Sequence, residues 1–247
     1  MYELHDTIVA VSSPTSDRRV IVRITGPDTV EICRQVCRVG FSPPIESLSL
    51  HDVASPTLLS GSLAIDDELK IDAQLYLFPA PHSYTGDDVA EIHAHTNSVV
   101  TEVLVSNLLE RGLRTAEPGE FTARAYLNGK IDLAQAEAVN EIIVSSNEYQ
   151  LTAAEKLLSG RLGETTAKLR AGLIDLLSLI EAGLDFSGED IEFIARDEAV
   201  KRLATIKDQL GQLLSGSIRY ESVIDLPAVG IAGAPNAGKS SLLNKLL

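Results

Sequence analysis

The sequence predicts an α+β domain over residues 1–120, a helical domain over 121–220, and the strand, glycine loop and helix start of a further domain over 221–247. Three observations support this order. The first part contains five strand-like runs and two helical ones, whereas the next hundred or so residues contain no strand-like run. The last part has an apolar run followed by a glycine-rich loop.

Short runs with β-branched residues and alternating polarity predict the strands of the first domain. They are TIVAV (7–11), VIVRI (20–24), LLSGSLAI (58–65), KIDAQLYLF (70–78) and VAEIHAH (89–95). Asp28 is an N-cap candidate for a helix in DTVEICRQVCR, whose apolar residues recur near helical spacing. A second helix is expected from Asn97 to near Gly112, and the prolines around positions 43, 44 and 56 predict connections.

Apolar residues at helical spacing dominate the second domain, after a predicted turn in AEPGEF (116–121). Asp132 is expected to cap an Ala-rich helix, DLAQAEAVNEII. Two later stripes are most simply helix-packing seams: Leu169, Leu173, Leu176, Leu177, Ile180 and Leu184, then Ala199, Leu203, Ile206, Leu210, Leu213 and Leu214. The acidic segment DFSGEDIEF (185–193) between them predicts a solvated hinge.

Composition restricts the class of protein. The apolar stretches are broken by charge before the roughly 18 residues that a membrane span needs. The start MYELHDTIVA has no basic region followed by an apolar core, so no secretory signal is expected. Cys33 and Cys37 are the two cysteines and cannot supply a four-ligand zinc site, so we expect a reduced, cytoplasmic protein. A net charge of −14 disfavours RNA binding by this segment alone.

The residues GAPNAGKS (233–240) match the phosphate-loop pattern G-x-x-x-x-G-K-[ST]. Ala228–Ala232 is predicted to be a buried strand before the loop, and SSLLNKLL a helix after it. Lys239 would then reach the terminal phosphates of a nucleotide, and the Ser240 hydroxyl would bind Mg²⁺. The alternative is a glycine-rich loop without a ligand. Because no further nucleotide-binding motif follows, we expect the part beyond about Leu226 to be mobile or loosely docked, and this fragment neither to bind nucleotide tightly nor to hydrolyse it.

Four strings together resemble the MnmE (TrmE) family of tRNA-modification GTPases: SYTGDDVAEIHAH (83–95), AEPGEFTARAYLNGKIDLAQAEAV (116–139), LDFSGEDI (184–191) and GAPNAGKSSLLNKL (233–246). The resemblance implies a folate-binding, dimerising N-terminal domain similar to the aminomethyltransferase T-protein, then part of a helical domain and a truncated G domain. It also implies a flavin- and NADH-dependent partner, MnmG. Together the two add carboxymethylaminomethyl or aminomethyl groups to the wobble uridine of tRNA, using GTP hydrolysis and a methylenetetrahydrofolate carbon.

By this resemblance, Arg23, Glu91 and Lys130 bind 5-formyltetrahydrofolate. A carboxylate such as Glu91 can accept paired N–H donors from a pterin, and the two cations can meet its carbonyl or glutamate oxygens. Without the resemblance, the simplest interpretation is that Arg23 and Glu91 are outward-facing charges on strands and that Lys130 is a solvated lysine in a loop.

The resemblance likewise implies that the phosphate loop binds GTP and that Asn236 coordinates K⁺, which can supply the charge of an arginine finger. The expected GTP-binding residues are Gly233, Asn236, Ala237, Gly238, Lys239, Ser240 and Ser241, with Mg²⁺ on Ser240. From the residues alone, Asn236 is an asparagine that tolerates a turn.

Two segments depart from the family pattern, because SSPTSDRR (12–19) and His95-Thr96-Asn97 stand where the family has glycines. Close backbone approach to a ligand is harder there, which lowers the expected folate affinity. His93 and His95 are two apart, but with no obvious third ligand, packing or hydrogen bonding is simpler than metal binding.

Two alternative functions of the chain stay open. One is a non-catalytic folate-binding scaffold, and the other is a ribosome-assembly GTPase, which leaves residues 1–220 unexplained.

Overall fold

The computed structural model describes residues 5–13, 19–37, 41, 55–65, 69–186, 192–215, 230–234 and 237–246. The chain divides into two compact units. The first comprises Met1–Ile143 with Leu157–Gly160, and the second Val144–Lys156 with Arg161–Leu247. The expected boundaries at residues 120 and 220 stay predictions.

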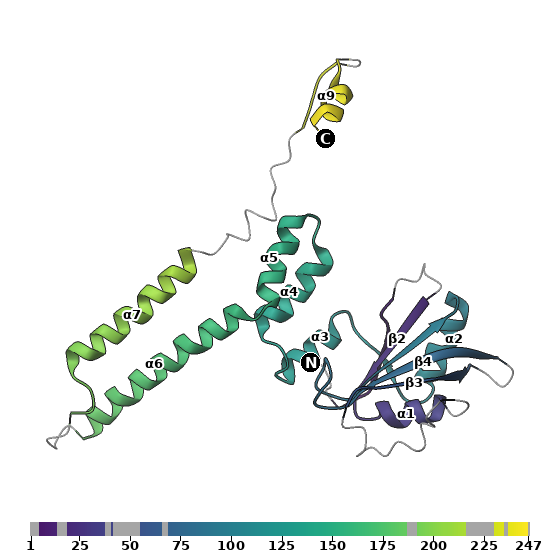
Figure 1. The fold of residues 1–247 in the computed structure, drawn as a ribbon, viewed down its shortest axis with the longest axis horizontal. Coiled ribbons are helices and arrows are strands. Elements are labelled where there is room, and N and C mark those ends of the chain that lie inside the picture. The colour runs from purple at the N-terminus through teal and green to yellow at the C-terminus, as the bar shows by residue number, and fades with distance from the viewer. Residues whose placement is uncertain are drawn as a thin grey trace. The chain divides into compact units, whose positions relative to one another are not determined.

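A six-stranded sheet forms the centre of the first unit, in the order β3-β4-β5-β2-β1-β6 (Figure 1). Its strands are β1 (Ile8–Val11), β2 (Arg19–Thr25), β3 (Thr57–Ala64), β4 (Lys70–Phe78), β5 (Val89–His95) and β6 (Arg114–Thr115). The pairing is antiparallel except between β1 and β6, which are parallel. The five predicted strands are confirmed to within a residue or two.

Alternation along the strands gives the sheet one apolar face. In β2, for example, Val20, Val22 and Ile24 are buried, whereas Arg19 before them and Arg23 between two of them are not. The apolar face packs with the helices α1 (Thr29–Val36) and α2 (Ser98–Leu109) in one core. Burial of these side chains is the main force that holds the unit together. The polar residues of the strands therefore gather on the other face.

Helix starts in the first unit largely follow the predicted caps. The side chain of Asn97 accepts a hydrogen bond from Val100 N at 3.0 Å at the start of α2. Helix α4 (Leu133–Val144) begins with a reciprocal pair, since Asp132 Oδ1 accepts from Gln135 N at 2.8 Å and Gln135 Oε1 accepts from Asp132 N at 3.0 Å. Asp28 occupies the N-cap position of α1, but its side chain does not cap the helix; Thr7 Oγ1 donates to it at 3.4 Å instead.

Three elements were not predicted: β6, α3 (Glu120–Leu127) and α5 (Glu148–Leu158). Helix α3 begins inside the segment expected to be a turn. Pro43 and Pro44 lie outside the described residues, and Pro56 directly precedes β3.

Two long helices, α6 (Arg161–Asp185) and α7 (Arg196–Ser215), make up most of the second unit and run side by side (Figure 1). A Cβ added at Gly172 of α6 would lie 3.5 Å from Ile206 Cδ1 of α7, so the helices approach closely there. The seam is narrower than the stripes predicted, because only Leu169, Leu176 and Ile206 of those positions are buried. Of the predicted hinge, residues 187–191 lie outside the described part.

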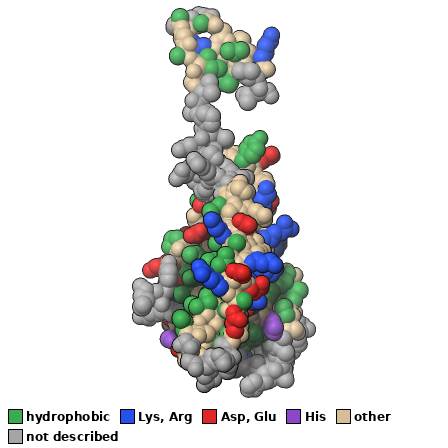
Figure 2. Space-filling model, turned by 90° about the vertical axis from the view of Figure 1, so that its left-hand side faces the viewer, with side chains coloured by type: hydrophobic (Ala, Val, Ile, Leu, Met, Phe, Trp, Pro, Cys, Tyr) green, Lys and Arg blue, Asp and Glu red, His purple; other side chains and the backbone are tan. Residues whose placement is uncertain are grey.

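The exposed members of the stripes remain on the surface. Leu177, Leu184, Leu203 and Leu214 are each more than half exposed. In the face shown in Figure 2, apolar, acidic and basic side chains are interspersed. No helix in the described residues is long and apolar enough to cross a membrane.

The predicted buried strand at Ala228–Ala232 is wrong for the three residues that can be judged. Gly230–Ala232 form no strand and are exposed, because no described strand lies beside them to pair with. The helix after the glycine loop is present as α9 (Lys239–Leu246).

Candidate functional site

A row of polar side chains crosses the face of the sheet opposite α1 and α2. Tyr76 of β4 stands opposite Glu91 of β5, and Glu91 stands opposite Arg23 of β2. Arg23 donates to Glu91 Oε1 through Nε at 2.8 Å and Nη2 at 2.7 Å. The fold thus brings together two of the three residues predicted to bind folate, although they lie 68 positions apart in the sequence.

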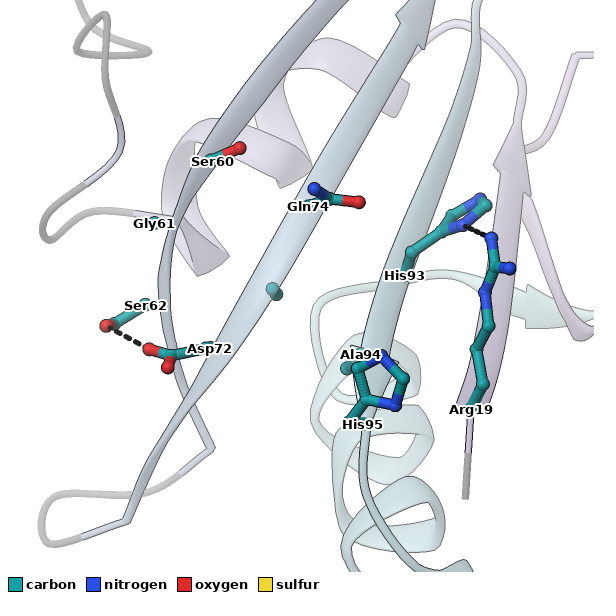
Figure 3. A pocket seen from close by; sticks show the side chains of 10 residues that line it. Arg19, Ser60, Gly61, Ser62, Asp72, Gln74, His93, Ala94 and His95 are labelled. Atoms are coloured by element: carbon teal, nitrogen blue, oxygen red, sulfur yellow. Dashed lines mark hydrogen bonds between the residues drawn. The ribbon is translucent and has the colours of Figure 1, made fainter. Parts of the chain in front are cut away.

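His93 extends this row along β5. Its Nε2 lies 2.9 Å from Glu91 Oε2, and its Nδ1 lies 3.1 Å from Arg19 Nη2 (Figure 3). Its ring packs on Tyr76 with centroids 4.6 Å apart and planes at 45°. The side chains of Glu91 and His93 are 18% and 13% exposed, so the carboxylate is shielded but reachable from the surface.

Hydrogen bonding keeps Glu91 ionised. Burial by itself would raise its pKa, but the hydrogen bonds from His93 and Arg23 outweigh burial and hold the pKa below its ordinary value. Arg23 places two nitrogens on Oε1 and His93 places one on Oε2, so three of the carboxylate's roughly four lone-pair positions are used. The position that remains open, on Oε2, can accept an N–H donor from a ligand such as a pterin.

Helix α3 places an aromatic ring beside Arg23. The Arg23 Cζ atom lies 5.8 Å from the centroid of the Phe121 ring, within the range of a cation–π contact. On the same helix, Thr122 Oγ1 lies 3.0 Å from the hydroxyl of Tyr84. Tyr84 is 42% exposed and offers an aromatic surface near the loop before β5.

An ion network anchors α3 to the sheet. Glu120 is fully buried and accepts from Arg114 at 2.7 and 3.0 Å, from Arg124 at 3.1 Å and from Glu117 N at 2.8 Å. Asp6 accepts from Arg114 Nε at 2.7 Å and also from the buried Arg124. These contacts fix α3, and with it the position of Phe121.

Lys130 lies in the turn that follows α3 and contacts a different segment. Its Nζ donates to Pro81 O at 2.8 Å, and neighbouring Asn128 donates to Thr85 O at 2.8 Å. A Cβ at Gly86, whose φ is +86°, would lie 3.1 Å from Asn128 Cβ and 3.2 Å from Lys130 Cγ, so glycine permits this close approach. No hydrogen bond or ion pair found in the described residues joins Lys130 to Arg23 or Glu91.

A polar concavity of about 660 Å³ adjoins His93 and extends over β4 to β3. Figure 3 shows Arg19, Gln74, Asp72 and His95 around it. A second concavity, of about 410 Å³ and mostly apolar, lies between α2 and the strands β1 and β2. Among the described residues, no group of three or more His, Cys, Asp or Glu side chains is arranged to hold a metal ion.

The glycine loop is described in part. Lys239 Nζ donates to Gly233 O at 2.9 Å and to Ala234 O at 2.7 Å, and Gly238 has a φ of +83°. Ala237, Gly238, Ser240 and Ser241 are exposed around the start of α9, whereas Asn236 lies outside the described residues. The Lys239 ammonium thus points back at the loop, where a phosphate would be bound in a nucleotide complex.

These features define a mixed α+β domain followed by a helical domain, and both have known relatives. The family described as the GTP-binding protein TrmE N-terminus matches residues 7–130, and the MnmE helical domain matches residues 133–225. The chain belongs to the MnmE, or TrmE, family.

Curated relatives named tRNA modification GTPase MnmE agree with this. The protein of Carboxydothermus hydrogenoformans is 39% identical over 247 residues, which cover 99% of this chain and 52% of the relative. That of Azoarcus sp. is 40% identical, covering 92% of this chain and 48% of the relative. The chain therefore spans about half the length of the curated relatives it matches.

Sequence reasoning named Arg23 and Glu91, and its expectation of packing or hydrogen bonding for His93 is confirmed, but it did not name the partners of His93. The signal was available, because the alternation of VAEIHAH places Glu91 and His93 on one face of a strand. The contacts with Arg19 and Tyr76 carried no such signal, since they depend on which strands flank β5.

Proposed function

We propose that this chain is part of a GTPase that modifies tRNA, and that its first unit binds a reduced folate. Family membership supports the tRNA-modification role, since relatives carry that name. The observation that carries the folate proposal is the Arg23–Glu91 pair on an accessible sheet face, with an ionised carboxylate that retains an acceptor position on Oε2.

In this proposal, 5-formyltetrahydrofolate presents an N–H donor of its pterin to Glu91. Arg23 and Lys130 meet its carbonyl or glutamate oxygens. Methylenetetrahydrofolate held by these residues would supply the one-carbon unit for the modification. Lys130 would exchange its bond with Pro81 O for the ligand.

The nucleotide part of the proposal assigns GTP to the loop residues Gly233 to Ser241. Lys239 would release the carbonyls of Gly233 and Ala234 and meet the phosphates, and Ser240 would bind Mg²⁺. Asn236 would coordinate K⁺. Two copies would associate through their N-terminal domains and act with MnmG on the wobble uridine.

The test is the modification state of tRNA. In cells that lack the gene, the wild-type gene should restore carboxymethylaminomethyl or aminomethyl uridine, measured by mass spectrometry of digested tRNA. Glu91→Ala should restore little, and Glu198→Ala, which changes an exposed pair on α7, should restore the wild-type amount. Equal amounts of these nucleosides with and without the gene would refute the proposal.

A second candidate is a non-catalytic folate-binding scaffold. Normal folate binding by a protein that does not restore the tRNA nucleosides would support this candidate.

A further inference from the structure

The bonds of His93 determine which of its nitrogens carries the proton. Arg19 Nη2 lies 3.1 Å from His93 Nδ1, and a guanidinium can only donate hydrogen bonds. Nδ1 is therefore the acceptor, and the proton lies on Nε2. That nitrogen, 2.9 Å from Glu91 Oε2, donates to the carboxylate.

The imidazole is also held in place from both neighbouring strands. The ring of Tyr76 on β4 packs against the imidazole with centroids 4.6 Å apart, and Arg19 on β2 forms a hydrogen bond with the imidazole Nδ1. Its direct cross-strand neighbours, Gln74 and Ile21, carry no charge. With these contacts the ring has one orientation, and its N–H is aimed at Glu91.

Glu91 is consequently fixed at both oxygens. Oε1 accepts from Arg23 and Oε2 accepts from His93. The terminal torsion of a glutamate is otherwise broad, so a carboxylate held at one oxygen can still rotate. Holding both oxygens keeps the remaining acceptor position, on Oε2, in a constant direction.

We infer that His93 is a positioning residue of this site, which orients the Glu91 carboxylate so that Oε2 can accept an N–H donor from a ligand. The identity of the ligand as a reduced folate rests on the proposed function. The positioning role itself rests on the described hydrogen bonds. Preorganisation of this kind raises affinity because less freedom is lost on binding.

Calorimetric titration of this chain with 5-formyltetrahydrofolate tests the inference through two isopolar variants. His93→Gln places an amide N–H near the position of Nε2 and keeps the bond to Glu91. His93→Asn carries its amide nearer the position of Nδ1, where it can accept from Arg19 but cannot reach Glu91. We expect the dissociation constant of His93→Gln to lie within about threefold of the wild-type value. That of His93→Asn should be roughly tenfold or more higher, the loss expected for a hydrogen bond to a charged group.

Glu198→Gln is the control, since Glu198 pairs with Arg202 on the surface of α7 and has no described contact with Glu91. It should bind like wild type. Wild-type affinity in His93→Asn, or an equal loss in His93→Gln and His93→Asn, would overturn the inference.

A second readout needs no ligand. The ionisation of the Glu91 carboxyl, followed by carbon-detected NMR, should shift to higher pH in His93→Asn and stay in place in His93→Gln. If wild type fails to bind the folate, the proposed function fails, and this titration still decides the positioning role. An unchanged Glu91 titration in His93→Asn would contradict it.

Discussion

At the residue scale, Glu120 connects two arginines inside the first unit. Its side chain is fully buried, as is that of Arg124, and removal of one member of a buried ion pair leaves an uncompensated charge. We expect Glu120→Gln to lower the free energy of unfolding by about 3 kcal/mol. The loss is measured by urea denaturation of the whole chain, in which hydrogen exchange of the backbone amides of β1 and α3 reports the unfolding.

The control is Glu198→Gln. Glu198 pairs with Arg202 on the surface of α7, where both side chains are nearly half exposed. No measurable change is expected, because exposed pairs contribute little. Equal effects of the two substitutions would show that burial of the network does not matter.

Acid should destabilise the first unit through the same residues. Burial alone would raise the pKa values of Glu120 and Asp6, but hydrogen bonds from Arg114 and Arg124 outweigh burial and lower both. A carboxyl whose pKa is lowered in the folded protein stabilises the fold at pH values above its ordinary pKa, which is about 4. This stabilisation is lost as the pH falls through the lowered pKa.

We therefore expect the urea midpoint of β1 and α3 to be constant from neutral pH to about pH 5 and to fall below about pH 4. Glu120→Gln should show a shallower fall, since it has one such carboxyl fewer. A midpoint that rises on acidification would contradict the assignment.

The sequence predicted which strands carry the charged residues of the site, but not the contacts that these residues make. Alternation identified the strands that carry Arg23 and Glu91, but their pairing follows from β5 lying between β2 and β4, which no local pattern encodes. No sequence pattern singled out Glu120 and Arg124, because charged residues are rarely fully buried and their partners come from distant segments. The roles of Arg23, Glu91 and Lys130 as folate ligands, and of the loop residues as nucleotide ligands, stay predictions.

At the scale of elements, α6 and α7 pack through few side chains. Leu176 is 5% exposed and its neighbour Leu177 is 53% exposed. Leu176→Ala should destabilise the pairing of these helices by about 2–4 kcal/mol, and Leu177→Ala by far less. Amide exchange along α7 measures both, and equal protection in the two variants would contradict the observed seam.

Two of the elements that were not predicted, α3 and β6, have separate physical reasons. Helix α3 turns charged Glu120 and Arg124 inward, so its buried face does not appear as an apolar stripe. Strand β6 has two residues, too few to show alternation. Conversely, the apolar run before the glycine loop predicted a strand, but Gly230–Ala232 are exposed and no strand of the described residues lies beside them.

At the scale of the whole molecule, the chain combines a sheet domain, long helices and a glycine loop. Because the Lys239 ammonium is bonded to loop carbonyls and the preceding segment is exposed, we expect weak binding of guanine nucleotide. Fluorescence titration with a labelled GDP should show a dissociation constant weaker than micromolar. Micromolar or tighter binding would contradict this.

Association of the chain is the second property at this scale. The proposed function expects dimers formed by the first unit, which light scattering at tens of micromolar would detect. A monomer at that concentration would count against dimerisation through the N-terminal domain.

The measurement that tests the central claim most directly is a calorimetric titration of this chain with 5-formyltetrahydrofolate, alongside Glu91→Ala and Lys130→Ala. Saturable binding that both substitutions weaken is expected, because Glu91 is ionised, oriented and accessible on the sheet face. No binding by the folded wild-type chain, or binding that neither substitution changes, would contradict a folate site centred on Glu91.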